Sequence, residues 1–174
     1  MAWLDDLDNT TGPGDGSENS TFDFNKWINK TKTFEGWKKE KYNDSKKILT
    51  VGYGFNLEDP ATLKILKSKG FDTEGLSKGT VHMTRAQADP LVADIYKQSY
   101  NIAAKRFPNF NTFPDEIKHT VTDMIYNMGE PRFSKFKKMQ HALLNNDYNE
   151  AAKEIKNSLY ATQVGDREIG RAHV

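Results

Sequence analysis

Apolar residues recur every three or four positions between residues 23 and 35, which is typical of an amphipathic helix. The expected apolar face consists of Phe24, Trp27, Ile28, Thr31 and Phe34. Asp23 can cap the first turn through its carboxylate, and Gly36 is a favourable residue just past the last turn. The pattern therefore predicts a helix that ends at Glu35, a position from which a side chain can face a cleft.

The segment from Lys41 to Leu57 has a different character. Its first part, YNDSKK, is a turn signal, because Asn, Asp and Ser side chains can bond their own backbone. The following ILTVGYGFNL is β-branched and aromatic, with glycines at alternate positions. We predict a small twisted hairpin or three-stranded sheet, with bulges at Gly52 and Gly54.

Two helices are expected after this sheet. Residues 60–70 fit a short helix, and a long one begins at the capping box of Thr84 and Gln87 and extends to about residue 105. Pro90 lies inside the long helix and should kink it or delay its regular start. The long helix is the best candidate for a connection between two lobes.

The remainder of the chain is expected to be helical. Pro114 is favourable at a helix start and Gly129 at a helix end. Further helices are predicted for residues 134–144 and after Asp147 and Glu150, which form a capping-like pair. A helix, a small sheet, a connecting helix and a helical bundle together predict an α+β fold.

The length and composition favour one domain preceded by a tail. Residues 9–21, NTTGPGDGSENST, are polar and Gly-rich without periodicity, so we expect residues 1–22 to be a flexible acidic tail or linker. The remaining length suits a single domain built as two lobes. Its expected parts are an N-terminal lobe at about 35–83, an inter-lobe helix at about 84–105 and a helical C-terminal lobe at about 106–174.

The net charge is +1, but acidic and basic residues are unevenly distributed along the chain. Residues 1–23 carry six acidic residues and no Lys or Arg, whereas the rest has 25 basic and 18 acidic residues and a net charge of +7. A basic body suits a polyanionic target such as nucleic acid or an anionic bacterial wall. A merely solvated surface explains the charge equally well, so charge alone selects no partner.

Several classes of protein are disfavoured. The chain has no cysteine, and its four histidines are scattered, so we expect neither disulfides nor a metal site, and no cofactor. No apolar run approaches the roughly 18 residues of a membrane span. The acidic start MAWLDDLDNT is unlike a secretory signal, so we expect synthesis in a cytoplasm and another export route to any wall target.

The helix end, the turn and the following strand carry a spacing that suits glycosidic hydrolysis. That reaction needs one carboxylic acid to protonate the leaving oxygen, and in inverting enzymes a second carboxylate about 6.5–9.5 Å away activates water. Glu35, Asp44 and Thr50 follow the spacing E-x8-D-x5-T. Partial desolvation beside Phe34 and Trp37 could raise the pKa of Glu35, whereas Asp44 in its polar turn should stay ionised. Thr50 has a hydroxyl that could fix the attacking water.

Simpler interpretations of the same residues stay open at this point. A glutamate at a helix end is usually a surface residue, and an aspartate in a turn such as YNDS usually bonds its own backbone. A threonine in a strand is by default a β-former. The spacing alone therefore gives only modest support to a catalytic role for these residues.

The motif E-x8-D-x5-T, ending in TVGYGFNL, resembles the catalytic signature of the phage-type lysozymes, the T-even phage lysozyme family of muramidases. MTRAQA resembles the start of that family's inter-lobe helix, and MIYNMGEPRFSKF its central helix and turn in the C-terminal lobe. DYNEAAKEIKNSLYATQVGDR resembles its penultimate segment. Several separate segments match in order over about residues 23–167, which makes the resemblance specific and implies a lysozyme-like two-lobed fold.

The resemblance implies roles for individual residues. Glu35 would be the general acid, Asp44 the carboxylate that positions or activates water, and Thr50 its partner. Arg167 in TQVGDR would lie against the catalytic glutamate across the cleft, where a cation lowers the pKa of an acid. Substrate-binding or acid-tuning roles are further expected for Gln163, Asn56 and Tyr53.

The chain departs from the family pattern at its site and its end. Phe55 stands where the best-known members carry a histidine after G-x-G, which puts a structural salt bridge in doubt but not the chemistry. Tyr160 occupies a place usually held by tryptophan. The chain stops seven residues after Arg167, short of the family's usual terminal helix.

We therefore expect an inverting, metal-independent muramidase that cuts the β-1,4 bond between N-acetylmuramic acid and N-acetylglucosamine in peptidoglycan. It would be phage-encoded, bind no nucleic acid, act as a monomer or as part of a larger virion protein, and reach the wall through a holin or by virion injection. Two alternatives stay open: a lytic transglycosylase, which Asp44 argues against, and a non-catalytic wall-binding or virion-structural module.

Overall fold

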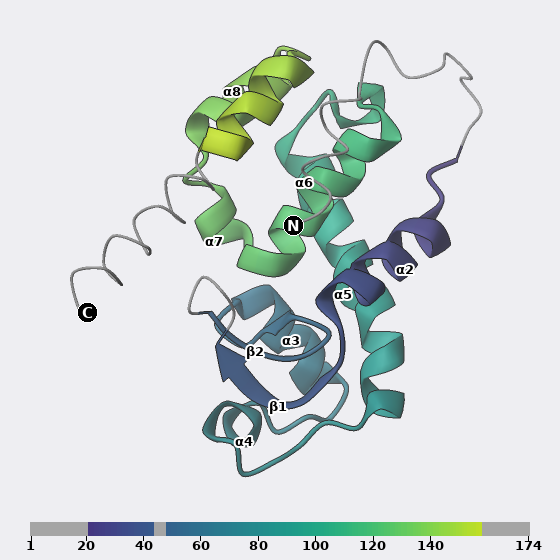
Figure 1. The fold of residues 1–174 in the computed structure, drawn as a ribbon, viewed down its shortest axis with the longest axis vertical. Coiled ribbons are helices and arrows are strands. Elements are labelled where there is room, and N and C mark those ends of the chain that lie inside the picture. Colours follow the sequence, from purple (N-terminus) through teal and green to yellow (C-terminus); the bar gives the residue numbers. More distant parts are fainter. Residues whose placement is uncertain (1–20, 44–47, 158–174) are drawn as a thin grey trace, which may run out of the picture.

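A computed structural model describes residues 21–43 and 48–157 of the 174-residue chain. The described part is mostly helical, with one small sheet, so the expected lysozyme-like α+β fold is confirmed. One region contains the sheet with two short helices, and the other contains the later helices (Figure 1). We call these the sheet lobe and the helical lobe. The long helix α5 (Arg85–Arg106) runs along both of them.

Helix α2 (Phe24–Glu35) has the bounds that its sequence predicts. The Asp23 side chain accepts a hydrogen bond from the backbone N–H of Lys26, which satisfies a donor of the first turn. Gly36 ends the helix with φ 66°, and its N–H donates to the carbonyl of Lys32. Glu35 is therefore the last helical residue, as expected.

The sheet is antiparallel, with the order β1-β2-β3. Its strands are β1 (Lys38–Asn43), β2 (Leu49–Gly52) and β3 (Phe55–Asn56). The predicted bulges at the glycines are wrong. Gly52 ends β2 and Gly54 lies in the tight turn to β3, with φ of 68° and 72°. The register shift lies instead in β1, between Lys38 and Tyr42.

The helices after the sheet follow the prediction with one omission. Helix α3 (Pro60–Ser68) and α5 lie where they are expected, and the capping box of Thr84 and Gln87 is formed. Of the two effects expected of Pro90, a kink or a delayed start, the delay does not occur, since α5 begins directly at Arg85. The sequence pattern missed α4 (Thr73–Lys78), a helix of six residues capped by Asp72.

The helical lobe contains a short 3-10 helix η1 (Phe110–Thr112) and helices α6 (Asp115–Met128), α7 (Glu130–Phe133) and α8 (Lys137–Leu144). A further helix covers residues 148–157, after the expected contact of the Glu150 N–H with the Asp147 carboxylate. The single helix predicted for 134–144 begins later, at Lys137. The preceding residues belong to α7 and its turn, because Ser134 caps α7.

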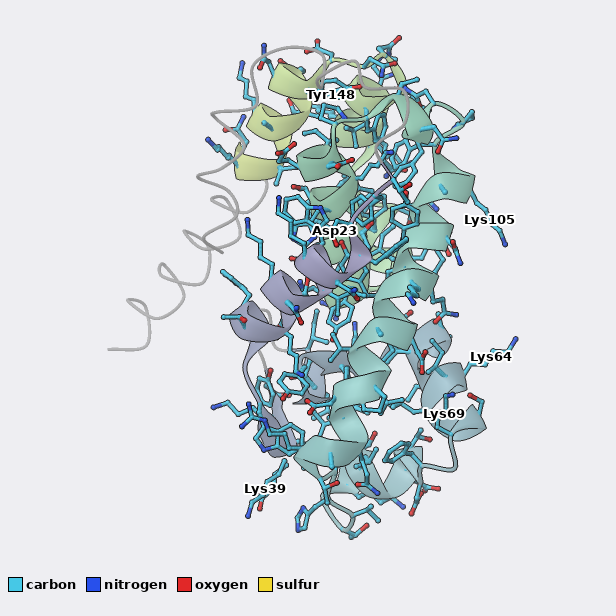
Figure 2. All side chains as sticks on the ribbon, turned by 90° about the vertical axis from the view of Figure 1, so that its right-hand side faces the viewer. Asp23, Lys39, Lys64, Lys69, Lys105 and Tyr148 are labelled. Atoms are coloured by element: carbon cyan, nitrogen blue, oxygen red, sulfur yellow. The ribbon has the colours of Figure 1, made fainter. Side chains whose placement is uncertain are left out.

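Two hydrophobic cores hold the molecule together, and each contains a residue from the other lobe. Tyr126 of α6 is buried in the sheet-lobe core, together with Val51, Phe55 and Leu66. Ile48, just before β2, is fully buried in the helical-lobe core. Figure 2 shows the length of the molecule, from Tyr148 in the helical lobe to Lys39 on β1. The exchange of core residues ties the two lobes to each other beside the candidate site.

Candidate active site

The carboxylate of Glu35 lies against the backbone of the turn between β2 and β3. A β-carbon built on Gly54 would overlap the Oε2 atom of Glu35 and would lie 2.6 Å from its Cδ atom. Gly54 also has a φ of 72°, which side-chain-bearing residues rarely adopt. The end of α2 and the turn therefore meet with no room for a side chain between them, and Glu35 is half-buried at this contact.

Tyr126 reaches the same turn from α6. Its hydroxyl donates a 2.7 Å hydrogen bond to the backbone carbonyl of Tyr53. Burial raises the pKa of the Tyr126 hydroxyl well above its usual value, and the nearby carboxylates of Glu35 and Asp123 raise it further. The hydroxyl thus stays protonated and remains a donor. The periodicity gives no signal for this residue, because Tyr126 lies opposite the apolar face formed by Ile117, Val121 and Met124.

Thr50 is buried on β2, and its backbone pairs with Asn56 of β3. Its Oγ1 donates a 3.1 Å hydrogen bond to the carbonyl of Tyr42, near the end of β1. Asp44 follows β1 directly in the chain but lies outside the described residues. The structure therefore places Thr50 beside the strand end that leads into Asp44, and its expected contact with a water stays a prediction.

Asn56 connects the sheet lobe to the helical lobe. Its side-chain Nδ2 donates to the carbonyl of Asn127 on α6 at 3.2 Å, and its Oδ1 accepts from the N–H of Glu58 at 2.8 Å. The side chain is buried, so both ends of the amide are satisfied within the protein. This arrangement fixes β3 against α6, close to the Glu35 contact.

Tyr53 points to the start of α5. Its hydroxyl donates to the carboxylate of Asp89 at 2.8 Å and accepts from Nε of Arg85 at 3.0 Å. Asp89 also forms a 2.9 Å ion pair with Lys32 of α2. The hydrogen bond from Lys32 lowers the pKa of the Asp89 carboxyl most, followed by that from Tyr53. Figure 1 shows α2 crossing α5 beside the sheet, in agreement with this bridge.

The structure thus brings Glu35, Thr50, Tyr53 and Asn56 to the sheet and its border with α2 and α6. The positions of Asp44, Gln163 and Arg167 lie outside the described residues. Within the ranges that the structure describes, no group of three or more His, Asp or Glu side chains could hold a metal ion. The chemistry that the described site offers is that of a single, sterically confined carboxyl group at the end of a helix.

The Phage lysozyme family matches residues 32–168 of the chain, a range that contains every expected site residue. The chain belongs to the phage lysozyme family. One relative, "Probable T4-type lysozyme 2" of Dictyostelium discoideum, is 27% identical over 145 residues. The aligned region covers 76% of this chain and 83% of that relative.

Membership in the phage lysozyme family confirms the resemblance seen in the sequence and makes the chain a muramidase-type cell wall hydrolase, a glycoside hydrolase. The family departure at Phe55 is accommodated by packing. Phe55 is fully buried in the sheet-lobe core, with its ring centroid 6.5 Å from that of Tyr126. Among the described residues, no helix is long and apolar enough to cross a membrane.

Two features of the site escaped the sequence analysis. The strand pattern shows the alternate glycines but gives no sign that Gly54 contacts Glu35. Nor does the sequence indicate the hydrogen bond from Tyr53 to Asp89, because it joins residues from a turn and a helix that are far apart in sequence. A polar residue at the start of the long helix gave no sign of its partner.

Proposed function

We propose that this lysozyme hydrolyses the β-1,4 bond between N-acetylmuramic acid and N-acetylglucosamine in peptidoglycan, with Glu35 as general acid. The carboxyl of Glu35, packed on Gly54 beside the buried Tyr126, is the observation that carries the proposal. A general acid must reach the leaving oxygen in a fixed orientation, and a wall of backbone on one side of the carboxyl limits its freedom.

We assign the second half of the chemistry to Asp44 and Thr50. Asp44 would act as the base that activates a water on the opposite face of the sugar, which inverts the anomeric configuration. Thr50 would hold that water, and Arg167 would lie against Glu35 with Gln163 nearby. The spacing of these residues in the sequence and the place of Thr50 beside the end of β1 support the assignment.

The biological setting is part of the proposal. The glycan would bind between the two lobes, with the enzyme acting as a monomer or as part of a larger virion protein, and without nucleic acid. A phage-encoded enzyme of this kind would be made in the host cytoplasm and would reach the wall through a holin or by virion injection. The family match supports the cell wall as the target, whereas the phage origin and the route to the wall are proposed from the resemblance in the sequence.

The decisive experiment is end-group analysis of digested wall. Purified peptidoglycan is incubated with the full chain, and the released fragments are analysed by mass spectrometry. Hydrated N-acetylmuramic acid at the reducing end supports the proposal, and an α-anomer as the first product supports inversion. Ends that are 1,6-anhydro sugars would identify a lytic transglycosylase. Binding to peptidoglycan without release of any reducing sugar would identify a non-catalytic wall-binding module.

A matched variant tests the role of Glu35. Glu35→Gln keeps the size and polarity of the side chain but removes the transferable proton. We expect turnover to fall by about 10²–10⁴-fold, the usual contribution of a general acid. The thermal unfolding midpoint, measured alongside, should stay close to that of the wild type. Turnover like that of the wild type in this folded variant would contradict the assignment.

A further inference from the structure

The turn that confines Glu35 is held in place from two directions. One hold comes from the helical lobe, where the hydroxyl of Tyr126 donates to the Tyr53 carbonyl at 2.7 Å. The other comes from α5, where the hydroxyl of Tyr53 lies between Asp89 and Arg85. Both holds act on Tyr53, the residue directly before Gly54. We propose that Tyr126 and Tyr53 are positioning residues, whose hydroxyls fix the Gly54 turn against the general acid; this rests on the function proposed above.

The contact at Gly54 makes the position of the turn matter for Glu35. Since a single added carbon at Gly54 would overlap the carboxylate, the turn leaves no slack on that side. A shift of the turn away from α2 would open space for water and for other rotamers of Glu35. Misplacement of a reacting group by about 1 Å can lower a rate by about 10²-fold.

The hydrogen bond from Tyr126 to the turn connects the two lobes. Tyr126 is fully buried on α6, yet its ring belongs to the sheet-lobe core and its hydroxyl ends at the turn. A protonated hydroxyl in such a buried place is a strong directional donor, and a carbonyl that loses it there stays unsatisfied. The hydroxyl therefore links the position of α6 to that of the turn.

The hydrogen bond of Tyr53 to Asp89 also connects the turn to α2. Asp89 accepts from the Tyr53 hydroxyl and pairs with Lys32, which lies three residues before Glu35 on the same helix. The Lys32 amino group lies 5.3 Å from the centroid of the Tyr53 ring. The turn and the last part of α2 are thus tied to the same carboxylate, so the relative position of Glu35 and Gly54 is fixed on both sides.

The interactions among Lys32, Asp89 and Tyr53 should contribute little to the stability of the fold, although they determine the position of the turn. The side chains of Lys32 and Asp89 are 31% and 44% exposed, and ion pairs at such exposure contribute little to stability. Tyr53, by contrast, is buried with its ring 5.7 Å from that of Trp37, which holds the ring in place by packing. Removal of its hydroxyl should therefore change the orientation of the turn more than the stability of the fold.

The test compares three variants that each lose one tyrosine hydroxyl. Tyr53→Phe and Tyr126→Phe remove the two holds, and Tyr148→Phe is the control. The Tyr148 hydroxyl also bonds a backbone carbonyl, that of Thr112, but it lies in the far part of the helical lobe (Figure 2). Kinetics on soluble peptidoglycan fragments of defined length are measured for the full-length proteins across a range of pH.

We expect kcat to fall about tenfold in Tyr53→Phe and in Tyr126→Phe, while KM changes less than about twofold. The alkaline limb of the kcat profile should shift to lower pH, because water admitted beside a carboxylic acid favours its ionised form. Tyr148→Phe should have the kcat of the wild type and the same alkaline limb of the kcat profile. The double variant of Tyr53→Phe and Asp89→Asn should have a kcat no lower than that of the more impaired single variant. The reason is that both substitutions remove the same hydrogen bond between Tyr53 and Asp89.

Each outcome bears on the inference. Unchanged kcat and an unchanged alkaline limb in folded Tyr53→Phe and Tyr126→Phe would overturn it, as would an equal loss in Tyr148→Phe. If Tyr126→Phe does not fold, Tyr53→Phe alone decides, because its ring packing is retained. An inactive wild type would reject the proposed function and this inference with it. An active wild type with unaffected variants would reject the inference only.

Discussion

The two ends of α2 are held by different kinds of interaction. Near its start, Trp27 is buried and stacks on His119 of α6, with ring centroids 4.5 Å apart and planes at 21°. At its end, Glu35 is half-buried, and its carboxylate lies against the backbone of a turn that polar side chains hold in place. Twelve residues thus combine an anchor made of aromatic packing with a chemical group placed by hydrogen bonds.

The difference separates stability from activity along one helix. Burial of a large aromatic ring stabilises the fold by several kcal/mol, whereas partly exposed hydrogen bonds and ion pairs stabilise it little. The precise placement of a carboxyl group, on the other hand, affects the rate far more than the fold. Changes at the start of α2 should therefore alter the free energy of unfolding, and changes at its end should alter turnover.

The largest effect is expected at the anchor. Trp27→Ala should lower the free energy of unfolding by about 3–5 kcal/mol, because it removes a buried ring that packs against Phe22 and His119. Denaturant unfolding monitored by circular dichroism measures this change. Turnover per folded molecule, measured at low temperature, should stay within about threefold of the wild type, since the Glu35 contact is untouched.

A matched control for this prediction lies on the same helix. Phe34 is also aromatic, but its side chain is 39% exposed. Phe34→Ala should change the free energy of unfolding by only about 0.5 kcal/mol. Equal destabilisation by the two changes would show that the anchor is not confined to the start of α2.

The next effect concerns the turn at the other end. Gly54→Ala places a methyl group on the carboxylate of Glu35, so we expect turnover to fall about 10²-fold as the carboxyl is displaced. The change also forces an alanine to adopt φ 72°, which costs about 1–2 kcal/mol of stability. Turnover and the free energy of unfolding are both measured.

Gly70→Ala separates these two consequences. Gly70 has a similar φ of 87°, but nothing lies within 4 Å of the position of an added β-carbon. It should therefore lose the same stability of about 1–2 kcal/mol and keep full turnover. A loss of turnover in Gly70→Ala as large as in Gly54→Ala would attribute the effect to backbone strain and not to the contact with Glu35.

The smallest effect is a pH dependence of the anchor. Burial lowers the pKa of His119 from 6.5 to about 3, with a smaller effect of Lys30, and its Nδ1 lies 2.8 Å from the Tyr96 hydroxyl. Between these two pH values the unfolded chain binds a proton that the folded chain does not. Stability is therefore complete above about pH 6.5 and falls as the pH decreases, by about 1.4 kcal/mol per unit. Below about pH 3 this contribution no longer changes.

Denaturant unfolding at about pH 7.5 and about pH 5.5 tests this dependence. His119→Asn should be less stable at both values but should lose about 1.4 kcal/mol less between them than the wild type. His82→Asn removes an exposed histidine and should keep the wild-type difference. An identical pH difference in all three proteins would exclude His119 as its source.

Local signals in the sequence were sufficient for most helices. The bounds of α2 follow from Asp23 and Gly36, and the start of α5 follows from Thr84 and Gln87, because caps act within one turn of the residue that forms them. The helix α4 was missed since six residues give too short a pattern to show a period. Alternate glycines do not distinguish a bulge from a tight turn, because both features favour a positive φ.

The site was only partly predictable for a different reason. Periodicity places Glu35 at the end of a helix and Thr50 on a strand, and both positions are confirmed. It does not say which element a side chain will meet. The bond from Tyr126 to Tyr53 joins residues 73 positions apart, and no local pattern around either residue indicates its partner. Such contacts depend on how the elements pack.

The burial of Ile48 in the core of the other lobe has a consequence for substrate entry. It is fully buried in the helical-lobe core, although it directly precedes a strand of the sheet lobe. A separation of the lobes that brought this side chain into water would cost about 1.5–3 kcal/mol. Only about one molecule in ten to one in two hundred would then be open at any moment. A long, stiff polymer would have to be captured by that minority, which makes the rate of association sensitive to a single aliphatic side chain.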